Sequence, residues 1–167
     1  MSRKLFLLII PVLSLGFMVA NCTQPQEVRI GDSAPDFRLP NLEGKTLSLS
    51  DFRGEPILLN FWTTTCTFCQ TEMPHIQEIY EDWTDKGLVL LTIAVDKSQP
   101  PVDEYMRTND FSFPVLLDIK RGIAHKYNVK TTPTTFFIDT NGIIRIKISG
   151  PFPDKEAIED RIEKIMP

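Results

Sequence analysis

The stretch NFWTTTCTFCQTEMPHI, residues 60–76, decides the fold, because it places two cysteines three residues apart where an apolar run gives way to a helical pattern. The run EPILLNFW that leads into it is typical of a strand buried on both faces. From Thr67 to Asp85 the apolar residues recur at helical spacing, namely Met73, Ile76, Ile79, Tyr80 and Trp83. The stretch therefore predicts a buried strand that leads through a Cys-x-x-Cys motif into a helix.

The sequence on either side of this stretch alternates predicted strands and helices. On the N-terminal side, the alternating segments Asp36–Leu39 and Lys45–Leu49 predict a small hairpin. Toward the C-terminus the pattern predicts strand, helix, strand, helix, hairpin and helix, in the segments KGLVLLTIAVD, PPVDEYMRTND, FSFPVLLD, RGIAHKYNV, TTPTTFFIDTNGIIRIKISG and DKEAIEDRIEKIMP. This order is typical of an α/β fold in which crossovers pair strands in parallel and an antiparallel hairpin, marked by Asn141-Gly142, completes the sheet.

The composition is that of an ordinary globular protein. Of the 167 residues, 42% are hydrophobic and 24% are charged, which excludes a disordered chain and a multi-span membrane protein. The formal net charge is -4, and the lysines and arginines are scattered, so the sequence shows no concentrated positive patch for a phosphate backbone. We therefore expect no nucleic-acid partner.

The N-terminus has a different character from the rest of the chain. A short basic start is followed by an uncharged run from Leu5 to Ala20, which predicts a signal peptide or membrane anchor over residues 1–21. The run contains Pro11 and is shorter than the roughly 20 apolar residues of a spanning helix, so a signal peptide is favoured over a permanent anchor. We expect residues 22–30 to form a tether and residues 31–167 to form one domain.

Cys22 follows the apolar run in the sequence VANC, which resembles the lipobox of bacterial lipoproteins. In that motif the cysteine is lipidated, and Asn21 departs from it because a small residue usually stands there. The alternative is that Cys22 merely ends an uncleaved anchor helix. Either arrangement places the domain at the extracytoplasmic face of the bacterial cell membrane. If Cys22 carries lipid, Cys66 and Cys69 remain as the one pair of cysteines. They would lie in an extracytoplasmic space, where disulfides persist.

The predicted position of Cys66 at a helix N-terminus suits redox chemistry. Its sulfur would face unsatisfied backbone N–H groups and the positive end of the helix dipole, which favour the thiolate that attacks disulfides. Cys69 lies on the same helical face, within bonding distance but further into the fold. The pair divides into an exposed attacking thiol, Cys66, and a resolving thiol, Cys69.

Two other uses of the cysteine pair are less favoured. A structural disulfide that closes a two-residue loop restricts the unfolded chain very little. A zinc site needs four ligands, and besides the pair the domain offers only His75 and His125, which are far apart in the sequence. We therefore expect a redox couple, no metal and no cofactor.

Several separate motifs resemble the TlpA/ResA-type family, thioredoxin-like thiol-disulfide oxidoreductases tethered to bacterial membranes and related to the AhpC/TSA and redoxin proteins. The resemblance begins near Gly31 and includes GDSAPDFRLPNLEGKTLSLSDFRGEPILLNFW, Cys66-Thr67-Phe68-Cys69, Glu72, Pro74 and TTPTTFFIDTNGII. It implies a thioredoxin fold, in which helices flank a central mixed sheet. It further implies an N-terminal β-hairpin extension and an inserted helix-strand unit before a cis-proline loop.

The resemblance also implies roles for residues around the cysteines. Pro133 corresponds to the cis-proline that faces the disulfide, and the Thr132 backbone to the partner of an extended substrate segment. Asn60 stands where ordinary thioredoxins have a buried aspartate, which leaves Glu72 as the expected proton carrier near Cys69; its alternative is a solvated helix carboxylate. Trp62 is expected beside the active-site loop in contact with substrate, or else as a plain core aromatic.

The implied function is reduction of disulfides in exported proteins, for example in cytochrome c maturation, with electrons supplied by a membrane thiol donor. The sequence departs from the family at Thr67 and Phe68, which lack the usual proline before the second cysteine, and at Thr65, which replaces a tryptophan. These positions surround the thiolate and help to set its reduction potential.

Three alternative functions remain open at this point. APDF and Thr63-x-x-Cys66 suggest a peroxiredoxin-like peroxidase, although Leu59 stands where that family has a proline. Cys66, Cys69 and His125 suggest a copper-delivery protein, although the cysteine spacing is one residue short of the usual pattern. An inert pair would indicate a non-catalytic anchored scaffold.

Overall fold

The computed structural model describes residues 27–167, so the predicted leader and Cys22 lie outside the described residues. Its main sheet has five strands: β3 (Ile57–Trp62), β4 (Val89–Ala94), β5 (Val115–Leu117), β6 (Thr134–Ile138) and β7 (Ile144–Ser149). Their order is β5-β4-β3-β6-β7, with β3, β4 and β5 parallel and β6 antiparallel to both β3 and β7. This is the mixed thioredoxin-type sheet that the sequence predicts. Gly142 takes a positive φ of 75° in the β6–β7 turn, where the Asn-Gly signal lies.

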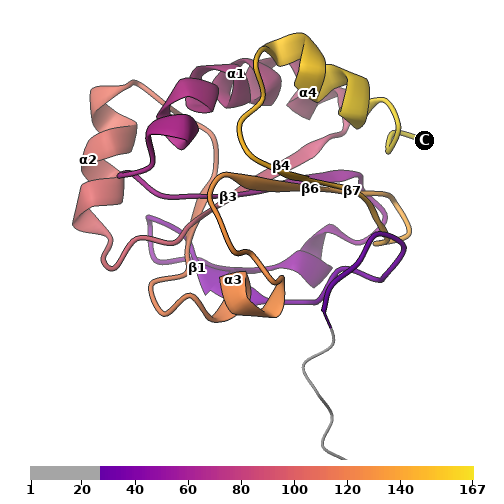
Figure 1. The fold of residues 1–167 in the computed structure, drawn as a ribbon, viewed down its shortest axis with the longest axis horizontal. Helices are drawn as coiled ribbons and strands as arrows, with labels where there is room; N and C mark the ends of the chain where they lie inside the picture. Colours follow the sequence, from indigo (N-terminus) through magenta and orange to yellow (C-terminus); the bar gives the residue numbers. More distant parts are fainter. Residues whose placement is uncertain (1–26) are drawn as a thin grey trace, which may run out of the picture.

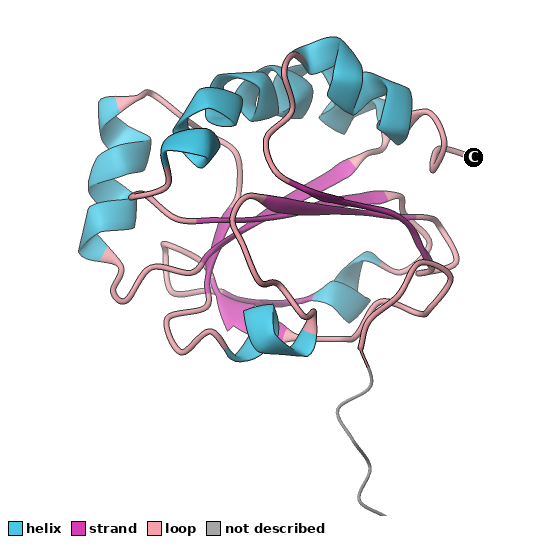
Figure 2. Ribbon diagram, in the orientation of Figure 1, coloured by secondary structure: helices cyan, strands magenta, loops and turns pink. Residues whose placement is uncertain are grey.

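Helices and a small hairpin cover the two faces of this sheet (Figures 1 and 2). On one face pack α1 (Thr67–Trp83), extended by the 3-10 helix η2 (Thr84–Lys86), α2 (Pro100–Thr108) and α4 (Lys155–Ile162). On the other face pack α3 (Gly122–Lys126), the 3-10 helix η1 (Leu49–Phe52), and the hairpin of β1 (Arg38–Pro40) and β2 (Thr46–Ser48). The N-terminal hairpin and the inserted α2–β5 unit are thus confirmed.

Strand β3 fixes the centre of the molecule because it is buried along its whole length. Leu58 and Trp62 pack into the cluster beneath α1, while Leu59 and Phe61 pack into the cluster on the α3 side. All four are fully buried, and each such side chain contributes about 1.5–3 kcal/mol to folding. The end of β3, where the cysteine loop begins, is therefore held rigidly.

The packing of the domain begins earlier than the sequence suggests. Val28, which we assigned to the tether, is only 8% exposed and lies in the cluster on the α3 side. The backbone N–H of Gly31 donates to the carbonyl of Ile144 at 2.8 Å. The predicted tether of residues 22–30 is therefore wrong at its C-terminal end, because Val28 supplies an apolar side chain to the core. Among residues 27–167, no helix combines the length and apolarity that crossing a bilayer requires.

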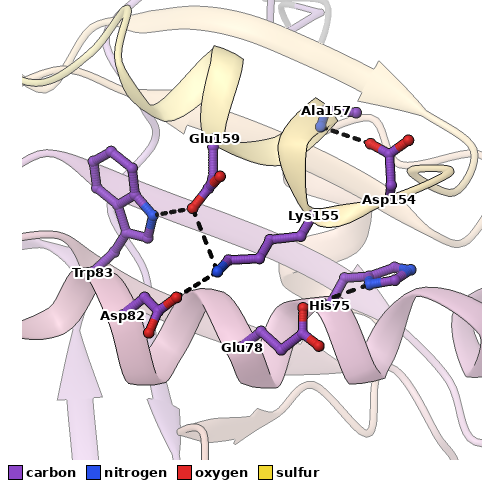
Figure 3. A network of polar contacts seen from close by, with 8 residues as sticks. All are labelled: His75, Glu78, Asp82, Trp83, Asp154, Lys155, Ala157 and Glu159. Carbon is purple, nitrogen blue, oxygen red and sulfur yellow. Dashed lines mark hydrogen bonds and ion pairs between the residues drawn. The ribbon is translucent and has the colours of Figure 1, made fainter.

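Polar contacts join the C-terminal helix to α1 (Figure 3). Lys155 pairs with Asp82 and lies 3.6 Å from Glu159, whose carboxylate also accepts a hydrogen bond from Trp83 Nε1 at 2.9 Å. On the same faces, His75 lies 3.9 Å from Glu78 and Asp154 caps α4 by accepting from Ala157 N. The contacts of Lys155 with Asp82 and of Trp83 with Glu159 cross between the two helices and hold α4 over α1.

Candidate active site

Cys66 is the N-cap residue of α1, and its sulfur takes the place of a capping oxygen. Its backbone is extended, with φ -89° and ψ 108°, and its Sγ accepts a hydrogen bond from the backbone N–H of Cys69 at 3.2 Å. That N–H is one of the donors a helix leaves unpaired at its start. A donor aimed at the sulfur is the contact that an attacking thiolate uses. Both cysteines are free thiols in this structure.

The two cysteines differ in their surroundings as well as their order. Cys66 is partly exposed, whereas Cys69 is fully buried. Burial, and after it a hydrogen bond with Cys66, raise the pKa of Cys69 to about 12. A sulfur atom of another protein can thus reach Cys66, whereas Cys69 keeps its proton until an acceptor takes it.

The cis-proline loop closes over the same sulfur. The Thr132–Pro133 peptide bond is cis, and the carbonyl of Thr132 accepts a hydrogen bond from Cys66 Sγ at 3.3 Å. Pro133 itself is buried, while Thr132 is partly exposed. The structure therefore brings Cys66, Thr132 and Pro133 together, as the resemblance implies.

The loop before Cys66 is held by a residue that sequence reasoning missed. Asp96 accepts hydrogen bonds from the Thr64 backbone N–H at 3.1 Å and from its hydroxyl at 2.5 Å, while Gln70 Nε2 donates to the Thr64 carbonyl at 2.8 Å. Asp96 follows β4, the parallel neighbour of β3. The carboxyl ends of parallel strands meet at one edge of a sheet. The position of Asp96 just after β4 therefore could have indicated that it lies near the loop that follows β3.

Glu72 is buried in the core behind Cys69. One carboxylate oxygen accepts from Asn60 Nδ2 at 2.7 Å and the other from the Phe152 backbone N–H at 3.1 Å; Asn60 Nδ2 also donates to Thr135 Oγ1 at 2.9 Å. Burial raises the pKa of Glu72 to about 7, and these two hydrogen bonds oppose part of the rise. The alternative of a solvated helix carboxylate is therefore wrong. At i+3 from Cys69, Glu72 shares its helical face.

Trp62 does not reach the surface. Its side chain is fully buried, and its ring lies 5.4 Å from the ring of Tyr105, measured between centroids. With no exposed area, the indole cannot contact a docked protein in this conformation. The sequence-based expectation of substrate contact by Trp62 is not met, because the side chain packs beneath the loop as a core aromatic. Substrate contacts must come from the exposed rim of the site.

His125, which the copper-delivery alternative requires, lies on α3, and Figure 1 shows α3 on the opposite face of the sheet from α1. Within the part of the chain that the structure describes, no three His, Cys, Asp or Glu side chains gather as a potential metal site. The arrangement does not fit a copper site that joins His125 to the cysteine pair.

Known proteins resemble this chain in sequence and in fold. Residues 30–147, which include both cysteines and the cis-proline, match the model of the AhpC/TSA family. The chain is 34% identical to the thiol-disulfide oxidoreductase ResA of Bacillus thuringiensis subsp. konkukian, over 99% of this chain and 98% of that protein.

Solved structures agree with this similarity. A protein described as the thiol:disulfide interchange protein DsbE from Chlorobium tepidum superposes with a TM-score of 0.78 and 31% identity, over 83% of this chain and 99% of that one. The exposed lipoprotein thioredoxin of Streptococcus pneumoniae superposes with a TM-score of 0.66 and 29% identity, over 78% of this chain and 99% of that one.

Proposed function

Since the chain belongs to the AhpC/TSA family and is a thiol-disulfide oxidoreductase, we propose that it is held at the extracytoplasmic face of the bacterial cell membrane and reduces disulfides of exported proteins there. The observation that carries the chemistry is the partly exposed Cys66 sulfur, placed between the Cys69 N–H and the Thr132 carbonyl. The signal-like leader and the lipobox-like Cys22 support the location. A structural neighbour that is itself an exposed lipoprotein supports it further.

The proposed cycle consists of two exchanges. The Cys66 thiolate attacks one sulfur of a client disulfide, which forms a mixed disulfide and releases the other client sulfur as a thiolate. Cys69 then loses its proton and attacks Cys66 Sγ, which forms the Cys66–Cys69 disulfide and releases the second client sulfur. Each turn oxidises two thiols of the enzyme and reduces one client disulfide. Proteins of cytochrome c maturation are the clients that we propose.

Glu72 is the proposed acceptor for the proton of Cys69. The thiol must be deprotonated to attack, and its raised pKa opposes this step. The Glu72 carboxyl shares a helical face with Cys69, and its pKa of about 7 suits proton uptake and release near neutral pH. The oxidised pair then needs two electrons, which we assign to a membrane thiol donor that reverses the exchange.

A redox titration of the full-length protein tests the proposed direction. In thiol buffers of graded potential, with free thiols counted by mass, we expect one reversible two-electron transition below about -200 mV, the range of thioredoxin and glutaredoxins. A value near -120 mV would mark an oxidant and contradict the proposal. A pair that never closes would contradict the exchange mechanism. Rapid peroxide consumption by the reduced protein would instead favour the peroxidase alternative.

Phe68 supplies an apolar contact surface on the rim of the site. It stands between the two cysteines in the first turn of α1 and is 64% exposed, while its neighbours Thr65 and Thr67 are exposed and uncharged. Because a large apolar side chain beside the reacting sulfur would be buried by a docked client, we propose that it contacts residues next to the client disulfide.

Replacing Phe68 with serine is expected to raise KM for a protein disulfide about tenfold, since loss of roughly 1.5 kcal/mol of apolar burial corresponds to that factor. Steady-state reduction of a disulfide-bonded client measures the change. Thr67→Ser, a substitution at the exposed neighbour, is the matched control and should leave KM unchanged. An unchanged KM in Phe68→Ser would contradict the proposed contact with the client. A fall confined to kcat, with a shifted reduction potential, would show that Phe68 acts on the cysteines instead.

A further inference from the structure

The exposed apolar side chains of the described residues point to a second surface. Three large apolar side chains are strongly exposed: Ile30, Phe68 and Ile119, at 64%, 64% and 44%. Phe68 belongs to the rim of the active site. Ile30 follows Arg29 in the sequence, and Ile119 precedes Lys120 and Arg121. Each of these two exposed isoleucines therefore lies next to at least one basic residue in the sequence.

Charge is divided between the two faces of the sheet. The sequence from Ile119 to Ile138, which contains α3, has no Asp or Glu, and all four of its basic residues are exposed, namely Lys120, Arg121, Lys126 and Lys130. On the opposite face, α1 carries three exposed acidic residues and no Lys or Arg, namely Glu78, Glu81 and Asp82. The α3 side of the molecule is therefore cationic relative to the α1 side.

The beginning of the described chain packs against α3 and adds to this surface. The hydroxyl of Tyr127 donates to the Pro35 carbonyl at 2.7 Å, and Lys126 Nζ donates to the Asp36 carbonyl at 2.6 Å. Asn128 donates to the carboxylate of Glu27. In Figure 1 the first described segment lies on the α3 side of the sheet. Folding thus brings residues 29–30 to the side of residues 119–130.

The acidic groups near this surface already serve as acceptors within the domain. Glu27 accepts from Asn128, Asp32 accepts from the backbone N–H of Arg29, and Asp118 is buried and accepts from the backbone N–H groups at the start of α3. Asp36, next to Lys126, accepts from the backbone N–H groups of Phe37 and Ser50. We call the surface formed by the following residues the tether face: Arg29, Ile30, Ile119, Lys120, Arg121, Lys126 and Lys130. Its basic residues are scattered in the sequence because the face joins two distant segments of the chain.

We propose that the tether face binds anionic lipid headgroups at the surface of the bilayer. Each Lys or Arg near an anionic membrane surface contributes about 1 kcal/mol, and the two isoleucines can enter the interfacial region. This function goes beyond disulfide reduction. It also gives the domain one orientation, in which α1 lies on the side of the sheet away from the headgroups.

The length of the chain before this face supports lipid as its partner. Glu27 follows Cys22 by five residues, which reach at most about 18 Å when extended. At physiological salt this is roughly two Debye lengths of about 8 Å. If Cys22 is held in the bilayer, a fully extended tether keeps the tether face within about two Debye lengths of the headgroups, and a less extended tether brings it into the range where their field is not screened. This part of the argument rests on the proposed tethering, whereas the division of charge does not.

Lysine footprinting of the full-length protein tests the proposal. The protein is added to vesicles of phosphatidylcholine alone or with phosphatidylglycerol, treated with an amine-reactive reagent, and read by mass spectrometry. We expect Lys120, Lys126 and Lys130 to react several-fold more slowly with the anionic vesicles, and this protection to vanish near 1 M salt, where the Debye length is about 3 Å. Lys86 and Lys164, exposed beside α1 and α4, are internal controls and should react equally with both kinds of vesicle.

A charge-reversal variant, Lys120→Glu with Lys130→Glu, should lose the protection of Lys126 and keep the wild-type turnover on a soluble disulfide. Equal labelling with neutral and anionic vesicles, or protection that persists in this variant, would overturn the proposal. Protection by DNA without vesicles, and none by phosphatidylglycerol, would assign the face to nucleic acid instead. Flotation of the full-length protein with neutral vesicles measures membrane attachment through the N-terminal anchor alone. Loss of flotation would contradict the proposed tethering, whereas loss of lysine protection with flotation retained would contradict the tether face.

Discussion

Replacing Cys69 with serine is expected to leave the protein joined to its clients through a disulfide at Cys66, whereas Cys66→Ser is expected to form no such adduct. The exposed Cys66 sulfur can still attack in the first variant, but the buried thiol that releases the client is gone. Both variants should lose turnover by at least about 10³-fold, because each removes one of the two sulfurs that act as a unit. Non-reducing electrophoresis of membranes, followed by mass mapping of the adducts, measures the outcome.

The double variant Cys66→Ser with Cys69→Ser is the control, and it should carry no adduct. Equal trapping by the two single variants would contradict the assignment of roles, because it would mean that a client sulfur reaches Cys69 as readily as Cys66. Absence of adducts in all variants under oxidising conditions would contradict the exchange mechanism itself. Turnover that survives in Cys66→Ser would have the same meaning.

The elements around this site could be predicted because their signals are local. The apolar run that ends at Trp62 and the helical spacing that begins at Thr67 each lie within one element, and the structure places β3 and α1 there. The boundary at Gly31 was misplaced because Val28 belongs to the same buried cluster as Tyr127, which lies nearly a hundred positions further along the chain. A short polar segment with one valine carries no local sign of burial.

The polar contacts of the site were less predictable for the same reason. Thr64 is held by Asp96, which lies 32 residues further on, and Glu72 by the backbone N–H of Phe152, 80 residues further on. A backbone N–H belongs to every residue other than proline, so the sequence does not mark the one that meets Glu72. The burial of Glu72, and the raised pKa that follows, could therefore be established only from the fold.

Replacing Glu72 with glutamine is expected to remove a fall in stability that the wild-type protein shows as the pH rises from about 4.5 to about 7. Burial raises the pKa of the carboxyl from 4.5 to about 7, so in this range the native state keeps a proton that the unfolded chain loses. The stabilising contribution is complete below pH 4.5 and is lost as the pH passes 7. At about 1.36 kcal/mol per pKa unit, the fall in the free energy of unfolding is about 3 kcal/mol.

Urea unfolding of wild type and Glu72→Gln between pH 4 and pH 8 measures this difference, and the two stability curves should converge or cross as the pH changes. Glu78→Gln, at an exposed carboxylate on the same helix, is the matched control and should keep the wild-type slope. Parallel curves for wild type and Glu72→Gln would show that Glu72 does not hold a proton in the native state near neutral pH. In that case Glu72 could not take up the proton of Cys69 near neutral pH, and Glu72→Gln would leave the pH dependence of mixed-disulfide resolution unchanged. The proposal expects two effects of Glu72→Gln: stability no longer falls with pH, and the resolution of the mixed disulfide loses its pH dependence near 7. If both occur, the same carboxyl holds the proton in the native state and takes part in resolution, because a merely structural carboxyl would change only the stability.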